Sequence, residues 1–334
     1  MSNEDYFKDK KVLVAGATGF IGTSLCEKLV SLGAQVRGTL YSHQPKLLND
    51  KIEYLPSDLT KYEDCLRVTS DMDFVFMAAA NSSGAGVMKS SPLVHLTPNV
   101  VMNTFMLAAA YEREVAKFCF ISSNTVYPQV DHSVKEEDAE FDFFDKYYVV
   151  GWMKRFSEIM CGMYANKIDS PLDMLIVRPG NLYGPFDKFT RKESKVIAAL
   201  IRRAVEKENP FIVWGDGMDM KDFLFIDDFI EGLILAFTST EHLEVVNIAS
   251  GHSVVLKDVI KLILELSCHK IDEVKFDLTK PVMIPNRYID ISKLSSATGW
   301  APKTSLRNGL DATIKWYQEE YASKNPEGKV HADL

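Results

Sequence analysis

Three glycines near the start of the chain have the spacing of a phosphate-binding turn. They lie in the run Gly16-x-x-Gly19-x-x-Gly22, directly after a predicted strand and at the start of a predicted helix. Glycine lets the backbone turn tightly and approach a ligand, and the first turn of a helix offers free amide groups to an anion. The pattern predicts binding of a dinucleotide pyrophosphate, and the alternative is a plain tight turn.

The segments around this turn predict a parallel sheet. Short β-type runs alternate with longer amphipathic segments, which is typical of strands joined by crossover helices. Gly33 is expected to end the first helix, Pro92 to open a later one and Pro98 to interrupt or kink that later helix. The predicted strands are residues 11–15, 35–40, 52–55, 73–77, 117–122 and 174–177.

The pattern becomes less regular after about residue 180, where a helix at 194–207, a strand at 211–213, a helix at 227–237 and a strand at 245–248 are predicted. We therefore expect an α/β protein with a doubly wound parallel sheet, the Rossmann fold, and a smaller mixed α/β C-terminal lobe. Residues 1–180, with 222–240 returning to them, are predicted to bind the dinucleotide. Residues 181–221 and 241–323 are predicted to bind the substrate, and residues 324–334 to form a frayed tail.

The composition excludes several classes of partner. The chain has 334 residues and a formal net charge of −8, whereas nucleic-acid-binding proteins usually carry clustered Lys and Arg. The first eleven residues are polar, and the longest apolar runs are too short to cross a bilayer. We expect a cytoplasmic protein that binds neither nucleic acid nor membrane.

Cysteine and histidine spacing predicts no metal site. The five cysteines form no Cys-x-x-Cys pair, and the seven histidines show no ligand spacing. We expect reduced packing thiols. His95, His132, His252 and His269 are expected on the surface or in loops.

The dinucleotide is predicted to be NAD, with NADP as the alternative. The second predicted strand ends at residues 36–41 without the Asp or Glu that would bind the ribose of NAD. It also lacks a basic cluster for the extra phosphate of NADP, so the preference for NAD is slight.

Short motifs are spread along nearly the whole chain. They are Gly16-Ala17-Thr18-Gly19-Phe20-Ile21-Gly22, Ser57-Asp58-Leu59-Thr60, Ala78-Ala79-Ala80, Ser122-Ser123-Asn124-Thr125-Val126-Tyr127-Pro128, Asn181-Leu182-Tyr183-Gly184-Pro185 and Trp214-Gly215-Asp216-Gly217. Together they resemble the extended short-chain dehydrogenase/reductase superfamily, and most closely its GDP-fucose-synthase-like branch. The resemblance implies that the cofactor is bound by Gly16, Thr18, Gly19, Phe20, Ile21, Gly22, Asp58, Leu59, Ala78, Ala79, Ala80, Asn99, Lys154 and Pro179.

The resemblance also implies a catalytic hydroxyl, a tyrosine and a lysine. In the superfamily the hydroxyl holds the sugar oxygen, the tyrosine carries its proton, and the lysine lowers the pKa of that tyrosine and binds the nicotinamide ribose. Ser123, assisted by Thr125, matches the hydroxyl, and Lys154 matches the lysine. Residues four apart share a helix face, so the tyrosine belongs at position 150, but Val150 stands there.

Other groups could carry the proton in place of this tyrosine. Tyr147 lies seven residues before Lys154, roughly 10 Å away along a helix axis. A bend at the helix start would let its hydroxyl reach the sugar, and the alternative is that it only packs the first turn. Lys154 acting through an ordered water is a further route.

Two more positions depart from the branch in a way that affects its epimerisation chemistry. The branch has a Cys and a His as acid and base, where this chain has Thr125 and Phe186. Because phenylalanine carries no proton, epimerisation at carbons 3 and 5 is not expected.

The resemblance implies that Asn124, Asn181, Val196, Lys221 and Arg287 bind a nucleotide sugar, with guanosine diphosphate as the expected carrier. Lys221 replaces the arginine usual in the branch, so positive charge is kept but the bidentate fork is lost. For Arg287, binding of the diphosphate and an ion pair with Asp290 are equal alternatives.

These observations predict an NAD(P)-dependent oxidoreductase acting at carbon 4 of a GDP-hexose or GDP-heptose for surface polysaccharide synthesis. A 4-epimerase or 4,6-dehydratase is one alternative, and a catalytically weak binding or regulatory subunit is another. A homodimer or homotetramer is expected from the resemblance alone.

Overall fold

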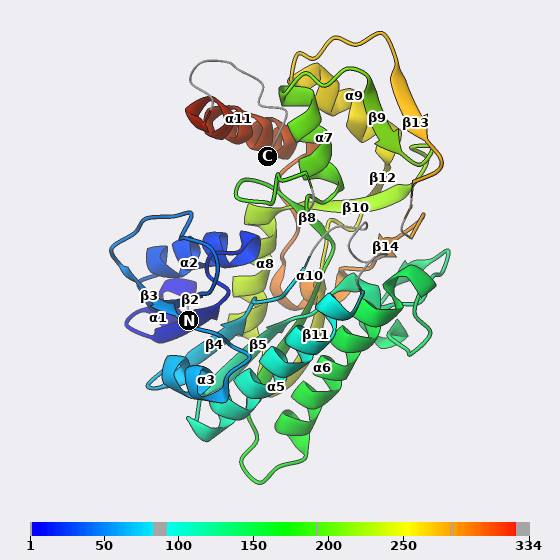
Figure 1. The fold of residues 1–334 in the computed structure, drawn as a ribbon. Coiled ribbons are helices and arrows are strands. Elements are labelled where there is room, and N and C mark those ends of the chain that lie inside the picture. The colour runs from blue at the N-terminus through cyan, green and yellow to red at the C-terminus, as the bar shows by residue number, and fades with distance from the viewer. Residues whose placement is uncertain (1, 83–91, 192, 281, 283, 325–334) are drawn as a thin grey trace.

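Seven parallel strands form the central sheet of the protein (Figure 1). The computed structural model describes residues 2–82, 92–191, 193–280, 282 and 284–324. The strand order is β11-β7-β5-β4-β1-β2-β3, which is the doubly wound fold predicted from the sequence. The bounds are β1 (Lys11–Ala15), β2 (Gln35–Leu40), β3 (Ile52–Pro56), β4 (Phe74–Met77), β5 (Lys117–Ile121), β7 (Asp173–Pro179) and β11 (Leu243–Ile248).

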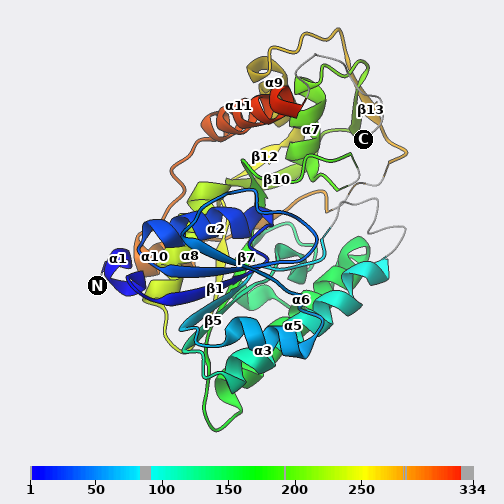
Figure 2. The ribbon, with the colours of Figure 1, turned by 60° about the vertical axis from the view of Figure 1, so that its left-hand side comes forward.

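Alternate residues of each strand fill two cores, one on each face of the sheet. In β1, Val12 and Val14 pack toward one core, and Leu13 and Ala15 toward the other. Because both faces are buried, the strands are continuous apolar runs. One face is covered by α2 (Phe20–Ser31) and α8 (Ile226–Ser239), and the opposite face by α3 (Tyr62–Thr69), α5 (Thr97–Glu112) and α6 (Tyr148–Asn166), as Figure 2 shows.

Helix ends follow the local sequence with one exception. The α2 helix ends before Gly33, which has a φ of +81°, as predicted. Pro98 was predicted to interrupt or kink the helix that Pro92 opens. The segment is interrupted just before it, but no kink forms, because Pro98 lies in the first turn of α5, where a missing amide leaves no hydrogen bond unmade. Pro92 opens a separate 3₁₀ turn, Pro92–His95.

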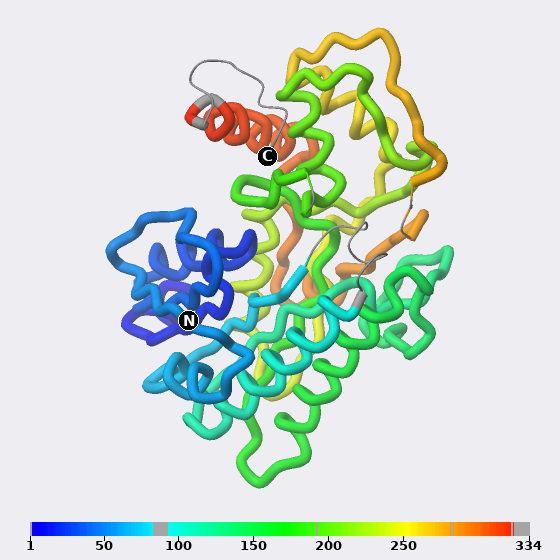
Figure 3. Tube along the Cα trace, in the orientation of Figure 1, coloured from blue at the N-terminus to red at the C-terminus, as the bar shows by residue number. Residues whose placement is uncertain are grey.

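The remaining elements build a smaller lobe beside the carboxyl ends of the strands. Figure 3 traces how the chain passes between sheet and lobe more than once. The strand β11 had been assigned to the lobe, and this is wrong, because it pairs with β7 in the main sheet. The lobe elements are β8 (Asn181–Tyr183), α7 (Val196–Val205), β9 (Phe211–Trp214), β10 (Met220–Phe225), β12 (Ser253–Val255), α9 (Leu256–Leu266), β13 (Val274–Asp277) and α11 (Leu306–Lys324).

The remaining short elements are α1 (Asn3–Phe7), α10 (Ser292–Thr298), the parallel pair of β6 (Ser133–Val134) with β14 (Tyr288–Ile289), and the 3₁₀ turns Asn124–Val126, Glu136–Asp138 and Asp145–Tyr147. The expected frayed tail lies outside the described residues from position 325 onward.

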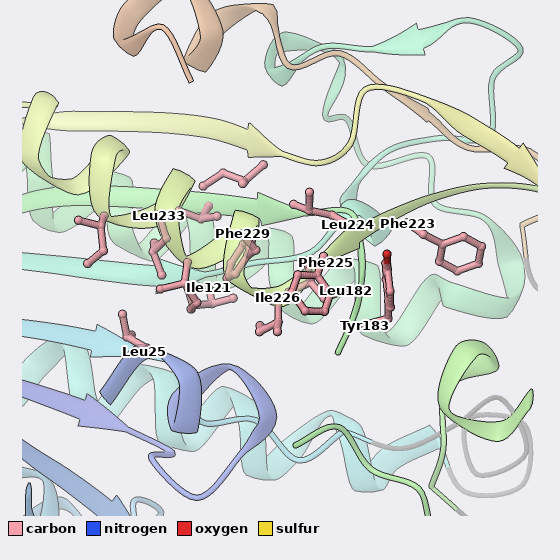
Figure 4. Close-up of a cluster of buried hydrophobic side chains, with 14 of the residues drawn as sticks. Leu25, Ile121, Leu182, Tyr183, Phe223, Leu224, Phe225, Ile226, Phe229 and Leu233 are labelled. Atoms are coloured by element: carbon pink, nitrogen blue, oxygen red, sulfur yellow. The ribbon is translucent and has the colours of Figure 1, made fainter. Parts of the chain in front are cut away.

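One continuous core joins the lobe to the sheet (Figure 4). Leu182 of β8 and Phe225 of β10 belong to the same cluster of buried side chains as Ile121 of β5 and Phe229 of α8. A shared core of this kind disfavours independent motion of the two parts. It fixes the lobe relative to the strand ends, where ligands bind in such folds.

A buried histidine is a second correction to the sequence analysis. His95 is 2% exposed in a 3₁₀ turn, although it was expected on the surface or in a loop, whereas His269 lies in a loop and is 8% exposed. One ring nitrogen of each meets a carbonyl oxygen, that of Asn81 for His95 and that of Glu208 for His269, at 3.0 Å in both cases. Buried polar atoms need such partners. Four of the five free cysteines are buried, as expected of packing thiols, and Cys268 is exposed.

One segment, Leu93–Glu112, is long and apolar enough to cross a membrane, with a mean hydropathy of 1.3. It consists largely of α5. In this fold α5 packs beside α3 and α6 against the sheet, so its apolar residues have a role in the core.

Candidate active site

The glycine turn after β1 is shaped to receive an anion. Gly19 caps α2 without a hydrogen bond from any described side chain, so the first amides of the helix remain open to a ligand. A Cβ on Gly16, whose φ is +82°, would lie 2.7 Å from the Ala79 Cα, and one on Gly22 would lie 2.1 Å from the Gly16 carbonyl oxygen. Only glycine fits this turn, and the geometry suits a dinucleotide pyrophosphate.

The other predicted cofactor residues surround this turn. Thr18, Phe20 and Ile21 are partly exposed on it, and Ala78 and Ala79 are partly exposed after β4. Since β4 and β1 are neighbours, the sheet brings these segments together.

Three of the predicted cofactor residues have structural partners that limit what they can offer a ligand. Asn99 is 2% exposed, and its amide exchanges hydrogen bonds with the Asn81 backbone, which shapes the loop after Ala80. Asp58 accepts from the Thr60 amide and hydroxyl. Leu59 is buried in the core, so only its backbone can face a cofactor.

The loop after β5, residues 122–128, which we call the serine loop, orients the Ser123 hydroxyl. Its oxygen accepts from the Thr125 amide at 3.2 Å and from the Thr125 hydroxyl at 3.0 Å. Because both bonds use the oxygen as acceptor, the Ser123 proton is left to donate to another atom. Asn124 donates to the Pro179 carbonyl at 2.9 Å, which ties the loop to the end of β7.

Lys154 lies buried against the end of β5. It is 9% exposed, its Nζ donates to the Ile121 carbonyl at 2.8 Å, and it lies 4.8 Å from the centre of the Phe120 ring. Burial lowers the pKa of Lys154 to about 8; the Glu158 carboxylate opposes this shift and the Lys195 ammonium adds to it. Val150 is partly buried one helical turn earlier on α6.

Tyr147 stands apart from this group. It lies in a 3₁₀ turn just before α6, and burial raises its pKa to about 12. The charges that act on it are those of Arg287 and Asp219 in the lobe. The structure therefore brings Ser123, Thr125 and Lys154 together and associates Tyr147 with the predicted substrate cations.

Two buried cations face the space between the sheet and the lobe. Arg287 is 3% exposed and donates to the carbonyls of Pro128 and Tyr127, while its Nε has no partner among the described residues. Burial lowers the pKa of Arg287 to about 10. Lys221 donates to the Ile284 carbonyl and lies 3.4 Å from an Asp219 oxygen.

These contacts argue against one of the two alternatives for Arg287, the ion pair with Asp290. Within the described part of the chain it makes no ion pair with Asp290, whose carboxylate accepts from the Ser292 amide at 2.8 Å. Burial lowers the pKa of Lys221, and the Arg287 charge lowers it further. Like charges held this close favour an anion between them.

Asn181 and Val196, the last two residues predicted to bind the substrate, lie at the start of β8 and of α7. Asn181 donates to the Asp222 carbonyl at 2.8 Å, which links β8 to β10. Val196 begins α7 and is 37% exposed.

The structure adds two charged residues that the sequence analysis missed. Asp187 is 7% exposed. Burial raises its pKa, and the positive charge of Lys195 lowers it in part. Lys195 caps α7 and acts on both Asp187 and Lys154. The sequence signal for Lys195 was its position directly before Val196, which was predicted to bind the substrate. Phe186, in contrast, packs its ring on Trp316, 5.3 Å between centres.

In the part of the chain that the structure describes, no three His, Cys, Asp or Glu side chains are grouped as metal ligands. The chemistry available to the described site is therefore that of hydroxyl, amine and guanidinium groups around an anion-binding turn.

A doubly wound sheet with a glycine turn, a serine loop and a buried lysine at its strand ends defines a nicotinamide-dependent enzyme. The chain belongs to the NAD dependent epimerase/dehydratase family, whose model matches residues 12–249. Its cofactor is NAD.

Named relatives cover nearly the whole chain. It is 30% identical to GDP-mannose 3,5-epimerase 1 of Oryza sativa subsp. indica, over 98% of this chain and 87% of that one. It is 29% identical to GDP-L-fucose synthase 1 of Arabidopsis thaliana, over 95% and 96%. The solved UDP-glucuronic acid 4-epimerase of Bacillus cereus, in complex with UDP-glucuronic acid and NAD, superposes with a TM-score of 0.81 at 26% identity, over 93% and 100%.

Replacing Gly16 by Ala is expected to weaken NAD binding by at least about tenfold. A non-glycine residue at this φ costs roughly 1–3 kcal/mol, and about 1.4 kcal/mol is a factor of ten. Calorimetric titration of cofactor-stripped protein measures the change. Gly162→Ala is the matched control, because its Cβ would meet only Leu243, at 4.0 Å. Unchanged affinity in Gly16→Ala would place the cofactor elsewhere.

Proposed function

We propose that the protein transfers a hydride to or from carbon 4 of a hexose or heptose linked to GDP. The observation that carries the proposal is that Lys154, whose pKa is about 8, donates to the Ile121 carbonyl two residues before Ser123, while Val150 and Phe186 offer no proton. Hydroxyl binding and redox chemistry need Ser123 and Lys154. Epimerisation at carbons 3 and 5 would need an acid and a base on the sugar, and position 186 provides neither. The relatives named for GDP-mannose and GDP-L-fucose support GDP as the carrier.

Ser123 would bind the reacting sugar oxygen. Its own oxygen accepts both bonds from Thr125, so its proton points to the ligand. Asn124 holds the loop against β7 while this happens. NAD, when bound at the glycine turn, supplies or takes up the hydride.

Lys154 would carry the proton through an ordered water and also hold the nicotinamide ribose. A group with a pKa near the working pH transfers protons most effectively, and about 8 meets this condition whereas the value of about 12 for Tyr147 does not. The positive charge of Arg287 acts on Tyr147, which supports a role for Tyr147 beside the substrate instead of in proton transfer. Slow turnover is expected, because a water relay replaces a positioned phenol.

The diphosphate would lie between Arg287 and Lys221. Both cations have a lowered pKa, and among the contacts described above only Lys221 has a carboxylate partner, Asp219. The unpartnered Nε of Arg287 leaves one donor for a phosphate oxygen.

We further propose that the protein works in the cytoplasm and supplies surface polysaccharide synthesis. We also propose that it is a homodimer, and the support for the dimer is one apolar face. Trp152 and Met163 of α6 are 42% and 53% exposed, and Tyr111 of α5 is 39% exposed. A run of exposed large apolar side chains on neighbouring helices marks a contact surface.

Adding GDP-hexoses or GDP-heptoses to NAD-loaded protein is expected to produce reduced cofactor, seen by nicotinamide absorbance. The oxidation rate should rise with pH through about 8, because only the neutral amine of Lys154 accepts the proton. Lys154→Met should lose about 10²–10⁴ in rate, the range of general acid–base catalysis.

Keto-acid acceptors and UDP-glucose complete this experiment. The acceptors test whether cofactor already reduced in the purified protein can be reoxidised. UDP-glucose tests whether the nucleobase of the substrate must be guanine. Redox change with UDP-sugars alone would refute the GDP assignment, and none with any sugar or acceptor would refute the proposed reaction.

Val150→Tyr is expected to raise the rate by about 10²–10⁴, because it places a phenol one turn before Lys154, whose positive charge lowers the phenol's pKa. Steady-state turnover measures the gain. Val149→Tyr is the control, since it points about 100° away around the helix. A folded, NAD-binding Val150→Tyr variant no faster than the wild type would show that the proton does not pass through this position.

Trp152→Glu is expected to convert a dimer into a monomer, because it places a charge in the apolar face. Sedimentation velocity measures the assembly. Leu48→Glu is the control, at a side chain that is 90% exposed on another surface. A monomeric wild-type protein would contradict the proposed interface.

A further inference from the structure

A buried carboxylate lies one helical turn beyond Lys154. Glu158 is 3% exposed and accepts four hydrogen bonds. Arg178 of β7 donates two of them, at 2.9 and 2.7 Å, Ser122 donates one at 2.5 Å, and Arg155 donates one at 3.0 Å. Burial alone would raise the pKa of Glu158, but Arg178 and Ser122 outweigh it and hold the pKa below its usual value. Glu158 is therefore an anion inside the protein.

Glu158 and Lys154 together hold consecutive residues at the end of β5. Lys154 donates to the Ile121 carbonyl, and Glu158 accepts from the hydroxyl of the next residue, Ser122. Residues four apart lie on one helix face, so a single face of α6 makes both contacts. The next residue along the chain is Ser123.

The charges around Lys154 give Glu158 a second effect. On α6 they are Glu158 and Cys161, and across the site there is Lys195 at the start of α7. The β5 strand contributes only the Ile121 carbonyl and the Phe120 ring. Burial raises the pKa of the Cys161 thiol, so it is neutral at ordinary pH. Among the described groups acting on Lys154, Glu158 is thus the anion that opposes Lys195.

Net stability of the fold is by itself a weak reason for burying the Glu158 carboxylate. A buried ion pair contributes little net stability, because desolvation of both ions offsets their attraction. A carboxylate that also contacts the serine loop and faces Lys154 acts on the site.

We propose that Glu158 is a positioning residue of this site, which fixes the backbone that carries Ser123 and sets the pH at which Lys154 gives up its proton. Its catalytic consequence rests on the proposed function, whereas its effect on Lys154 does not.

The first test measures the protonation of Lys154 without any turnover. Cofactor-free protein is labelled with acetic anhydride across pH, and acetylation of Lys154 is read by mass spectrometry. In Glu158→Gln the labelling midpoint should move to lower pH. Labelling near pH 7 should rise about fivefold, from a shift at the lower end of the range for a nearby charge.

Two variants accompany this measurement. Glu158→Gln leaves Arg178 buried without a counter-charge, which can prevent folding. The double variant Glu158→Gln/Arg178→Gln removes both charges and keeps hydrogen-bonding groups, and its midpoint should also fall. Arg155→Gln is the matched control, because it removes a partly exposed partner and leaves the carboxylate, Arg178 and Ser122 in place; its midpoint should not move.

The second test separates positioning from charge. Ser122→Ala keeps the ion pair and removes the bond to the serine loop. It should lower kcat about tenfold with KM for the nucleotide sugar unchanged, and leave the Lys154 midpoint where it is. One net hydrogen bond to a charged group, about 1.5 kcal/mol, corresponds to this factor.

The outcomes distinguish this inference from the proposed function. An unmoved midpoint in both the single and the double Glu158 variants would overturn the inference, even in an active enzyme. A lowered midpoint in a protein that shows no redox change with any sugar would support the inference and refute the proposed reaction. Equal losses of kcat in Ser122→Ala and Arg155→Gln would overturn the positioning role.

Discussion

The ion pair between Glu158 and Arg178 joins the parts of the protein that make its site. It connects α6, which carries Lys154, to β7, which neighbours the serine-bearing end of β5. Arg178 also donates to the Tyr127 hydroxyl at 3.1 Å and to the Glu136 carbonyl at 2.7 Å. The loop after β5 is thereby held from several sides, because each buried polar group needs its partner.

Positive charge without full compensation is the second organising feature. Lys154, Lys221 and Arg287 are largely buried, and in each of them burial lowers the pKa. Keeping such groups out of water is unfavourable unless an anion joins them. The open amides of the glycine turn suit the NAD pyrophosphate, and Lys221 and Arg287 are the lobe cations to which we assign the diphosphate in the proposed function. The shared core beneath β8 and β10 joins the lobe that carries these cations to the sheet.

Binding groups and proton carriers are separate features of this site. Val150 offers no phenol one turn before Lys154 on α6, and the Phe186 ring is turned toward Trp316. The hydroxyl pair of Ser123 and Thr125 remains, and so does the amine of Lys154. Binding and hydride transfer depend on the binding groups, whereas rate and pH dependence depend on which group moves the proton. These two properties can therefore change independently in one fold.

The sequence by itself determined the parallel sheet and the glycine turn, because apolar periodicity and turn glycines are local properties. It also exposed the valine at position 150. Only the tertiary structure decided that β11 joins the main sheet, that His95 is buried, and that Arg287 bonds to the serine loop instead of Asp290. The roles of Glu158 and Lys195 were decided there too. Burial and the field of distant charges depend on which segments meet in space, and no local pattern encodes that.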